Sequence, residues 1–195
     1  MSAWWRRPDL RSEDGSITVE TVIILPALIL FYITSFTFFD AYRTQSVITR
    51  TGYVVGDLMS RQTAVGVADI VGLRDMFAYM TFNVGPSDIR VTEVAGGAAA
   101  DGAPVVVWSH GTRGDGGADP DEMGADELAE LAETIPDLLP DERITIVETW
   151  VAYRPPFFVG LPAYTMESLV MTRPRYDERI CFTRPDGTDV CASGP

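Results

Sequence analysis

The feature that most constrains this chain is an apolar run at residues 17–39, in which Glu20 is the only charged residue. A helix needs about 20 apolar residues to cross the hydrocarbon core of a bilayer, and this run is longer than that. Pro26 lies inside the run, and membrane helices tolerate proline because neighbouring groups satisfy the freed carbonyl. The run therefore predicts a single transmembrane helix at residues 16–40.

A cleavable secretory signal is the first alternative for this run. The apolar part of such a signal spans about 7 to 15 residues and is followed by a small-x-small cleavage site. The run at 17–39 is longer, and it ends in FFDAYRTQ, which contains no such site. We therefore expect signal peptidase to leave the segment in place.

A short charged leader, MSAWWRRPDLRSEDG, precedes the run and ends at Gly15, and Glu20 is the fifth residue after that glycine. A carboxylate near the end of a membrane helix is costly unless a cation neutralises it. Cleavage after Gly15 would leave an α-amine on Ser16, with a reference pKa of about 7.7 to 8.0. Glu20 could then pair with the amine of a neighbouring copy in a helix-packed filament.

At these residues the chain resembles a TadE/TadF-type pseudopilin of tight-adherence (Flp) pilus systems, over roughly its first 60 residues. The matching positions are Gly15, Val19 and Glu20 in GSITVE, Leu25 and Pro26 in ILPALIL, and Tyr42, Arg43 and Gln45. The resemblance implies cleavage by a prepilin peptidase after Gly15 and an anchor in the bacterial inner membrane. It also implies contacts with other pilins or pseudopilins and with the pilus assembly machinery.

Two departures from the major Flp pilins bear on the role of this chain within such a system. Thr21 follows Glu20 where the major Flp pilins carry tyrosine, and the chain is much longer than a major pilin. Both differences favour a minor component over the bulk filament subunit. The alternative is an uncleaved single-pass anchor whose periplasmic domain serves as an adaptor in an envelope complex, because many such anchors carry a charged residue near one end.

The net charge of the chain limits the partners it can bind, and its two cysteines indicate the cellular compartment of the domain. The formal net charge is −13, which disfavours binding to nucleic acid through its phosphates. The only cysteines, Cys181 and Cys191, flank the turn-prone segment RPDGTD. A disulfide across such a hairpin fits an oxidising compartment, whereas two reduced thiols would fit the cytosol. We expect the disulfide, and hence a cytoplasmic N-terminus and a periplasmic C-terminal domain.

The remaining chain predicts an α+β fold with an antiparallel or mixed sheet and covering helices. The first helix should continue to about residue 61, since Val47, Val54 and Leu58 recur at helical spacing. Gly52 and Gly56 in this stretch could admit a partner helix or reflect loose packing. Further helices are expected at 67–82 and 125–136, and strands at 89–94, 104–109, 143–153, 163–172, 178–183 and 189–192.

These elements divide the chain into four parts. They are a leader at 1–15, a transmembrane helix at 16–40, a helical extension with a second helix at 41–82, and a periplasmic domain at 83–195. The connection RPPFFVGLP at 154–162 is apolar for a loop. We expect it to pack within the core; if exposed, it would form an apolar patch for a partner or the membrane surface.

Residues that could carry chemistry are few. The acidic loop 115–126 could bind calcium, but an EF-hand would need glycine where Pro120 stands and glutamate where Asp126 stands, so a solvated loop is the default. His110 is the only histidine, and Ser109, His110 and Asp115 in one stretch lack the converging geometry of nucleophilic catalysis. We expect a structural protein without enzymatic activity, metal or cofactor.

Overall fold

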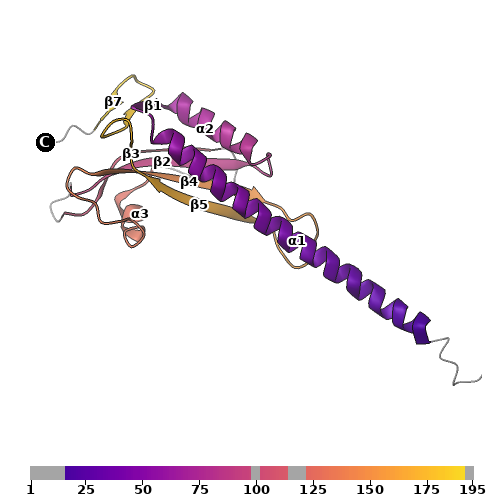
Figure 1. The fold of residues 1–195 in the computed structure, drawn as a ribbon. Helices are drawn as coiled ribbons and strands as arrows, with labels where there is room; N and C mark the ends of the chain where they lie inside the picture. The colour runs from indigo at the N-terminus through magenta and orange to yellow at the C-terminus, as the bar shows by residue number, and fades with distance from the viewer. Residues whose placement is uncertain (1–15, 98–101, 114–121, 192–195) are drawn as a thin grey trace, which may run out of the picture.

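The computed structural model describes residues 16–97, 102–113 and 122–191. Helix α1, Ser16–Met59, is a single helix that begins well outside the domain and ends against its sheet (Figure 1). This confirms the predicted continuous helix to within two residues of its C-terminal end. The second half of α1 packs on two strands of the sheet, and its buried apolar side chains are Ala41, Ile48, Val55 and Met59.

The main sheet has four antiparallel strands in the order β3-β2-β4-β5. The strands are β2 Ser87–Ala95, β3 Val105–Thr112, β4 Arg143–Tyr153 and β5 Tyr164–Thr172. All four were predicted, with boundaries within three residues, because each is a short run rich in β-branched residues bounded by turn formers. The last pair across β4 and β5 is Tyr153 with Tyr164, which places the loop 154–163 at the end of the sheet from which α1 projects.

Helices cover both faces of this sheet. Helix α2, Val67–Met80, contacts β2 and β3, and together with α1 it covers one face over a core that includes Ile70, Phe77 and Val147. On the opposite face a smaller cluster gathers around helix α3, Ala125–Glu130, and includes Leu128 and Ile146. The fold is therefore α+β, as predicted.

A second, three-stranded sheet ties the C-terminus to the start of α2. Strand β1, Ala64–Gly66, pairs in parallel with β6, Cys181–Thr183, which pairs antiparallel with β7, Asp189–Val190. The predicted hairpin is confirmed, although both of its strands are shorter than expected. Strand β1 was not predicted, since three residues carry no periodic signal and the pairing joins segments far apart in the chain.

Two expectations about the second half of the chain were wrong. The helix expected at 125–136 ends at Glu130, because the next residues form tighter turns in which the Leu131 amide bonds to Leu128 and the Thr134 amide to Leu131. Pro136 also disfavours helical geometry in the residue before it. The connection 154–162 is not packed in the core as a whole: Leu161 packs against the core, but Phe158 is 95% exposed and Phe157 is 46% exposed.

The two glycines of α1 allow close approach to the sheet, not to a partner helix. A Cβ on Gly56 would lie 3.0 Å from a Val170 methyl group, and one on Gly52 would lie 3.3 Å from the Ser168 hydroxyl. Both neighbours belong to β5. Glycine at these positions therefore lets the helix axis lie closer to the strand than a larger residue would permit.

Candidate functional site

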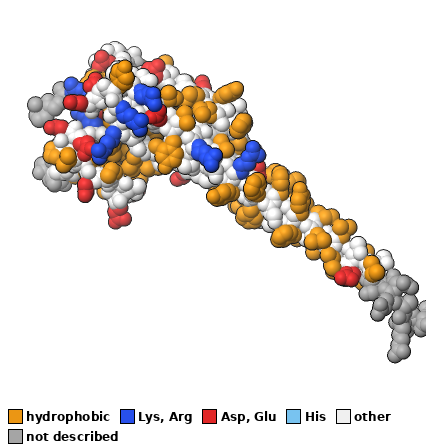
Figure 2. All heavy atoms as spheres, in the orientation of Figure 1, with side chains coloured by type: hydrophobic (Ala, Val, Ile, Leu, Met, Phe, Trp, Pro, Cys, Tyr) orange, Lys and Arg blue, Asp and Glu red, His pale blue; other side chains and the backbone are white. Residues whose placement is uncertain are grey.

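The most unusual surface of the molecule is the first half of α1, which projects from the domain (Figure 2). Hydrophobic side chains cover most of it, and Ile17, Ile23, Leu30 and Phe31 are each more than 60% exposed. Within the described chain, α1 is the one helix long and apolar enough to cross a membrane. An apolar surface of this extent needs lipid or another protein to cover it.

The predicted cleavage and pairing residues lie at the free end of this helix. Gly15 is outside the described residues, and Ser16 is the first residue of α1. Glu20 is exposed, and none of the described residues forms a hydrogen bond or ion pair with its carboxylate. The neighbouring Thr21 hydroxyl donates its hydrogen bond to the Ile17 carbonyl within the helix, and not to the Glu20 carboxylate. Among the described residues this carboxylate therefore has no partner.

A hydrogen bond marks the point where α1 meets the domain. The Tyr153 hydroxyl, at the end of β4, donates to an Asp40 carboxylate oxygen at 2.7 Å. Asp40 is the first charged residue of α1 after Glu20. Burial, followed by the Asp40 carboxylate, raises the pKa of Tyr153 above its usual value. The contact fixes the end of the sheet to the helix at the last residue of the predicted span.

The loop 154–163 extends from that point along α1 towards the free end. The ring of Phe157 packs edge-on against the ring of Phe36, with centroids 6.1 Å apart. Thr37 is fully buried, and Ile33 and Thr34 are half-buried, whereas the helix before them is exposed. The loop and the apolar helix thus share a contact inside the predicted span.

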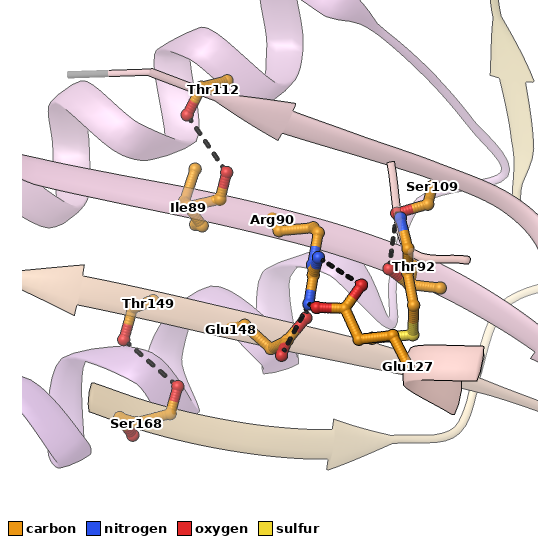
Figure 3. A network of polar contacts seen from close by, with 10 residues as sticks. Ile89, Arg90, Thr92, Ser109, Thr112, Glu127, Glu148, Thr149 and Ser168 are labelled. Atoms are coloured by element: carbon orange, nitrogen blue, oxygen red, sulfur yellow. Dashed lines mark hydrogen bonds and ion pairs between the residues drawn. The ribbon is translucent and has the colours of Figure 1, made fainter. Parts of the chain in front are cut away.

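A cluster of charges lies on the α3 side of the sheet (Figure 3). The buried guanidinium of Arg90 donates to both carboxylate oxygens of Glu148 at 2.6 and 3.0 Å and to both of Glu127 at 2.7 and 2.9 Å. It also lies 5.4 Å from the Trp150 ring. Burial alone would lower the Arg90 pKa, but the hydrogen bonds that Arg90 donates to Glu148 and Glu127, together with the attraction of their charges, outweigh burial and raise the pKa. The cluster connects β2, β4 and α3.

A second buried carboxylate, Glu93, holds the C-terminal segment on the α2 side. It accepts hydrogen bonds from the Trp108 indole at 2.6 Å and from the Ile180 amide at 3.0 Å. Burial raises the Glu93 pKa, and these two hydrogen bonds oppose that rise. Because Ile180 precedes β6, the contact joins the main sheet to the small one and has a structural role.

The residues considered for catalysis are separated by the sheet. The Ser109 hydroxyl lies 2.7 Å from the Thr92 hydroxyl and accepts from the Met123 amide, on the α3 side. His110 is stacked on Phe182 on the other side, with ring centroids 5.2 Å apart, and burial lowers its pKa. Asp115 lies outside the described residues.

Possible metal ligands and the cysteine pair are the last candidate groups. The described residues contain no group of three or more histidine, cysteine or acidic side chains placed to hold a metal ion. Most of the acidic loop 115–126 lies outside the described residues.

Cys181 and Cys191 form a disulfide with a Cα–Cα distance of 4.5 Å, which confirms the predicted pairing.

Comparison of the chain with models of known protein families, with curated proteins and with solved structures finds no match.

Sequence patterns missed the contacts that join the helix to the domain. Asp40 with Tyr153, and Phe36 with Phe157, join positions more than a hundred residues apart. The Arg90 cluster was missed because its carboxylates also come from other elements, 37 and 58 residues further along the chain. The one available signal was the charged residue Arg90 between apolar neighbours in a strand, which predicts a paired charge but not its partner.

Proposed function

We propose that this chain is a minor, pseudopilin-like component of tight-adherence pilus assembly, anchored in the bacterial inner membrane by the first half of α1. The N-terminus then lies in the cytoplasm and the α+β domain in the periplasm. The observation that carries the proposal is the division of one continuous helix into a projecting apolar half and a half packed on the sheet.

This division supports a role in assembly as well as anchoring. A helix that is apolar on all sides and, from Ile17 to Tyr32, is exposed in the described structure can associate with lipid or with equivalent helices of other subunits. The exposed Glu20 carboxylate, one turn from the start of α1, is placed to meet the Ser16 amine of a neighbouring copy after cleavage at Gly15. Charge pairing would then set the register between helices.

The disulfide supports the proposed compartment. Disulfides persist in oxidising environments such as the periplasm and are rare in the cytosol. Cys181 and Cys191 lie on the domain, at the end of the molecule away from the projecting helix. Placing the domain in the periplasm leaves Ser16 on the cytoplasmic side, where a prepilin peptidase acts on its substrates.

The first experiment is N-terminal sequencing of the membrane-extracted protein from cells with and without their prepilin peptidase. The proposal expects a chain beginning at Ser16 only when the peptidase is present. An intact leader in both strains would overturn the pseudopilin assignment and leave the uncleaved anchor with a periplasmic adaptor domain.

The second experiment separates assembly from anchoring. We expect Glu20→Ala to leave membrane insertion intact and to remove most surface pili, because the unpaired Ser16 amine would then be buried between helices. Thr21→Ala is the matched control, since its hydroxyl bonds only within the helix. Normal piliation in the Glu20 variant would contradict the pairing role.

A further inference from the structure

The loop 154–163 exposes two aromatic rings at the end of the sheet from which α1 projects. No residue from Pro155 to Met166 is charged, and the Phe158 ring is almost entirely outside the fold. An apolar ring that is exposed to water gives no favourable free energy, whereas moving it out of water would be favourable. The position of the loop along α1 indicates what covers it.

The depth of the loop can be read from the helix rise. Phe36, which contacts Phe157, precedes Asp40 by four residues, or about 6 Å along the axis, towards the apolar end. Ile33, where burial of α1 begins, lies about 10 Å beyond Asp40 in the same direction. If the apolar run 17–39 spans the bilayer, the contact between Phe157 and Phe36 lies inside the membrane-spanning part of α1 and not beyond its end.

Charges at the base of the loop fit the same level. Arg154 begins the loop and Arg43 lies one turn after Asp40, and both side chains are exposed. Basic side chains at this height reach lipid phosphates while apolar neighbours enter the acyl region. Phe82, in the turn between α2 and β2, is also exposed and lines a cleft with Asp40 and Arg43. Exposed aromatic side chains therefore lie near this level in two loops that contact α1.

We propose that the loop 154–163 inserts Phe157 and Phe158 into the interfacial region of the same membrane that α1 crosses. The domain is then seated on the bilayer at two points, and the Tyr153–Asp40 hydrogen bond fixes the angle between helix and sheet. The inference rests on the proposed membrane anchor. It goes beyond that anchor because the loop contributes a second lipid contact from another part of the chain.

The test places a fluorescent thiol label at one position at a time in the full chain, whose own cysteines are joined in the disulfide. The variants are Phe158→Cys in the loop, Leu28→Cys in the middle of the projecting helix, and Tyr176→Cys as the matched exposed aromatic. Tyr176 follows Arg175, whose amide bonds to the Ser60 carbonyl, about 36 Å along α1 from Phe36. Each protein is reconstituted in vesicles of phosphatidylcholine and phosphatidylglycerol, at protein-to-lipid ratios that run from one copy per vesicle to several.

We measure quenching by lipids that carry a nitroxide near the head of the acyl chain, and quenching by aqueous iodide. The expected result is that nitroxide lipid reduces fluorescence about twofold or more at position 158, while position 176 responds only to iodide. Position 28 should be protected from iodide because it lies within the hydrocarbon. Together these results would establish both the anchor and the loop contact.

Other outcomes separate the two proposals. Protection at 28 with iodide quenching at 158 would overturn the loop insertion and leave the anchor standing. Iodide quenching at 28 would overturn the anchor, and the loop insertion with it. Protection at 158 that grows with the number of copies per vesicle, without nitroxide quenching, would assign the loop to a second copy of the chain and also overturn the lipid contact.

Discussion

At the scale of single residues, one hydrogen bond between the Tyr153 hydroxyl and Asp40 joins the projecting helix to the domain. The donor is a buried phenol and the acceptor is a carboxylate, and hydrogen bonds to charged groups contribute more to stability than neutral ones. The contact also raises the pKa of Tyr153. Stability should therefore respond both to the hydroxyl and to alkaline pH.

We expect Tyr153→Phe to lower the free energy of unfolding by about 1 to 2 kcal/mol, since the ring is kept and only the hydroxyl is lost. Tyr164→Phe is the control, because Tyr164 packs on Tyr153 through its ring and is partly exposed. It should change the free energy of unfolding by less than about 0.5 kcal/mol. Urea unfolding of the full chain in detergent, followed by tryptophan fluorescence, measures both.

The pH dependence of the same bond has a definite sign. The folded protein keeps the Tyr153 proton at pH values where the unfolded chain, with a phenol pKa of about 10, has lost it. The folded state therefore binds more protons, and the free energy of unfolding falls as pH rises above about 10. The difference between wild type and Tyr153→Phe should shrink in that range; a difference that stays constant would contradict the assigned pKa shift.

The Arg90 cluster predicts unequal effects for its two carboxylates. Glu148 is 10% exposed and Glu127 is 44% exposed, although both bond to Arg90 through two oxygens. Glu148→Gln should cost about 2 to 3 kcal/mol in the free energy of unfolding, because the buried Arg90 charge loses the more buried of its two carboxylate partners. Glu127→Gln should cost about 1 kcal/mol or less, since solvent screens that pair. Equal costs in urea unfolding would show that exposure does not govern the cluster.

At the scale of elements, α1 shows that residue spacing can identify a helix but cannot identify which side of that helix is buried. Val47, Val54 and Leu58 predict a helix by their spacing of seven and four. The structure buries Ile48, Val55 and Met59, which have the same spacing one residue later, while Val54 is 41% exposed. The spacing of apolar residues identifies the helix. Because these two sets of residues are both apolar, contact with β4 and β5 decides which of the two sets is buried.

Glycines on the two packed helices should respond oppositely to larger side chains. Gly72 in α2 has no atom within 4 Å of an added Cβ, so Gly72→Ala should stabilise by about 0.5 to 1 kcal/mol through helix propensity. Gly56 faces Val170, so Gly56→Ala should gain less and Gly56→Leu should lose about 1 to 3 kcal/mol. Urea unfolding measures all three, and a stabilising Gly56→Leu would contradict the close approach of α1 to β5.

At the scale of the whole molecule, the core and the exposed helix occupy separate parts of the chain. Every buried apolar side chain among the described residues lies at or after Ala41. The disulfide, both sheets and the Tyr153–Asp40 bond are also retained by residues 40–195. The domain should therefore not need the projecting helix in order to fold.

We expect a fragment of residues 40–195 to be a folded monomer without detergent, because it keeps the whole core and loses the large apolar surface. Light scattering and a cooperative unfolding transition measure this. A fragment of residues 52–195 is the control: it lacks Ile48 and should be much less stable, by about 2 to 5 kcal/mol or more. Aggregation of the longer fragment would show that the loop 154–163 needs lipid or a partner even without the projecting half of α1.

Features of this protein that depend on local sequence pattern could be predicted without the fold. Apolar length predicted the long helix, β-branched runs predicted the four main strands, and the turn between Cys181 and Cys191 predicted the disulfide. These signals are local because period, turn chemistry and chain length each act over a few residues. The expected cleavage at Gly15 and pairing of Glu20 rest on the same kind of signal and stay predictions.

The surfaces that meet in the fold could not be predicted from local pattern. The partners of Asp40, Arg90 and Glu93 come from distant segments, so no spacing within one element could reveal them. The apolar connection at 154–162 was expected in the core because its composition favours burial. The fold leaves Phe158 outside because β4 and β5 end beside α1, and the sheet has no further layer at that end to cover the loop.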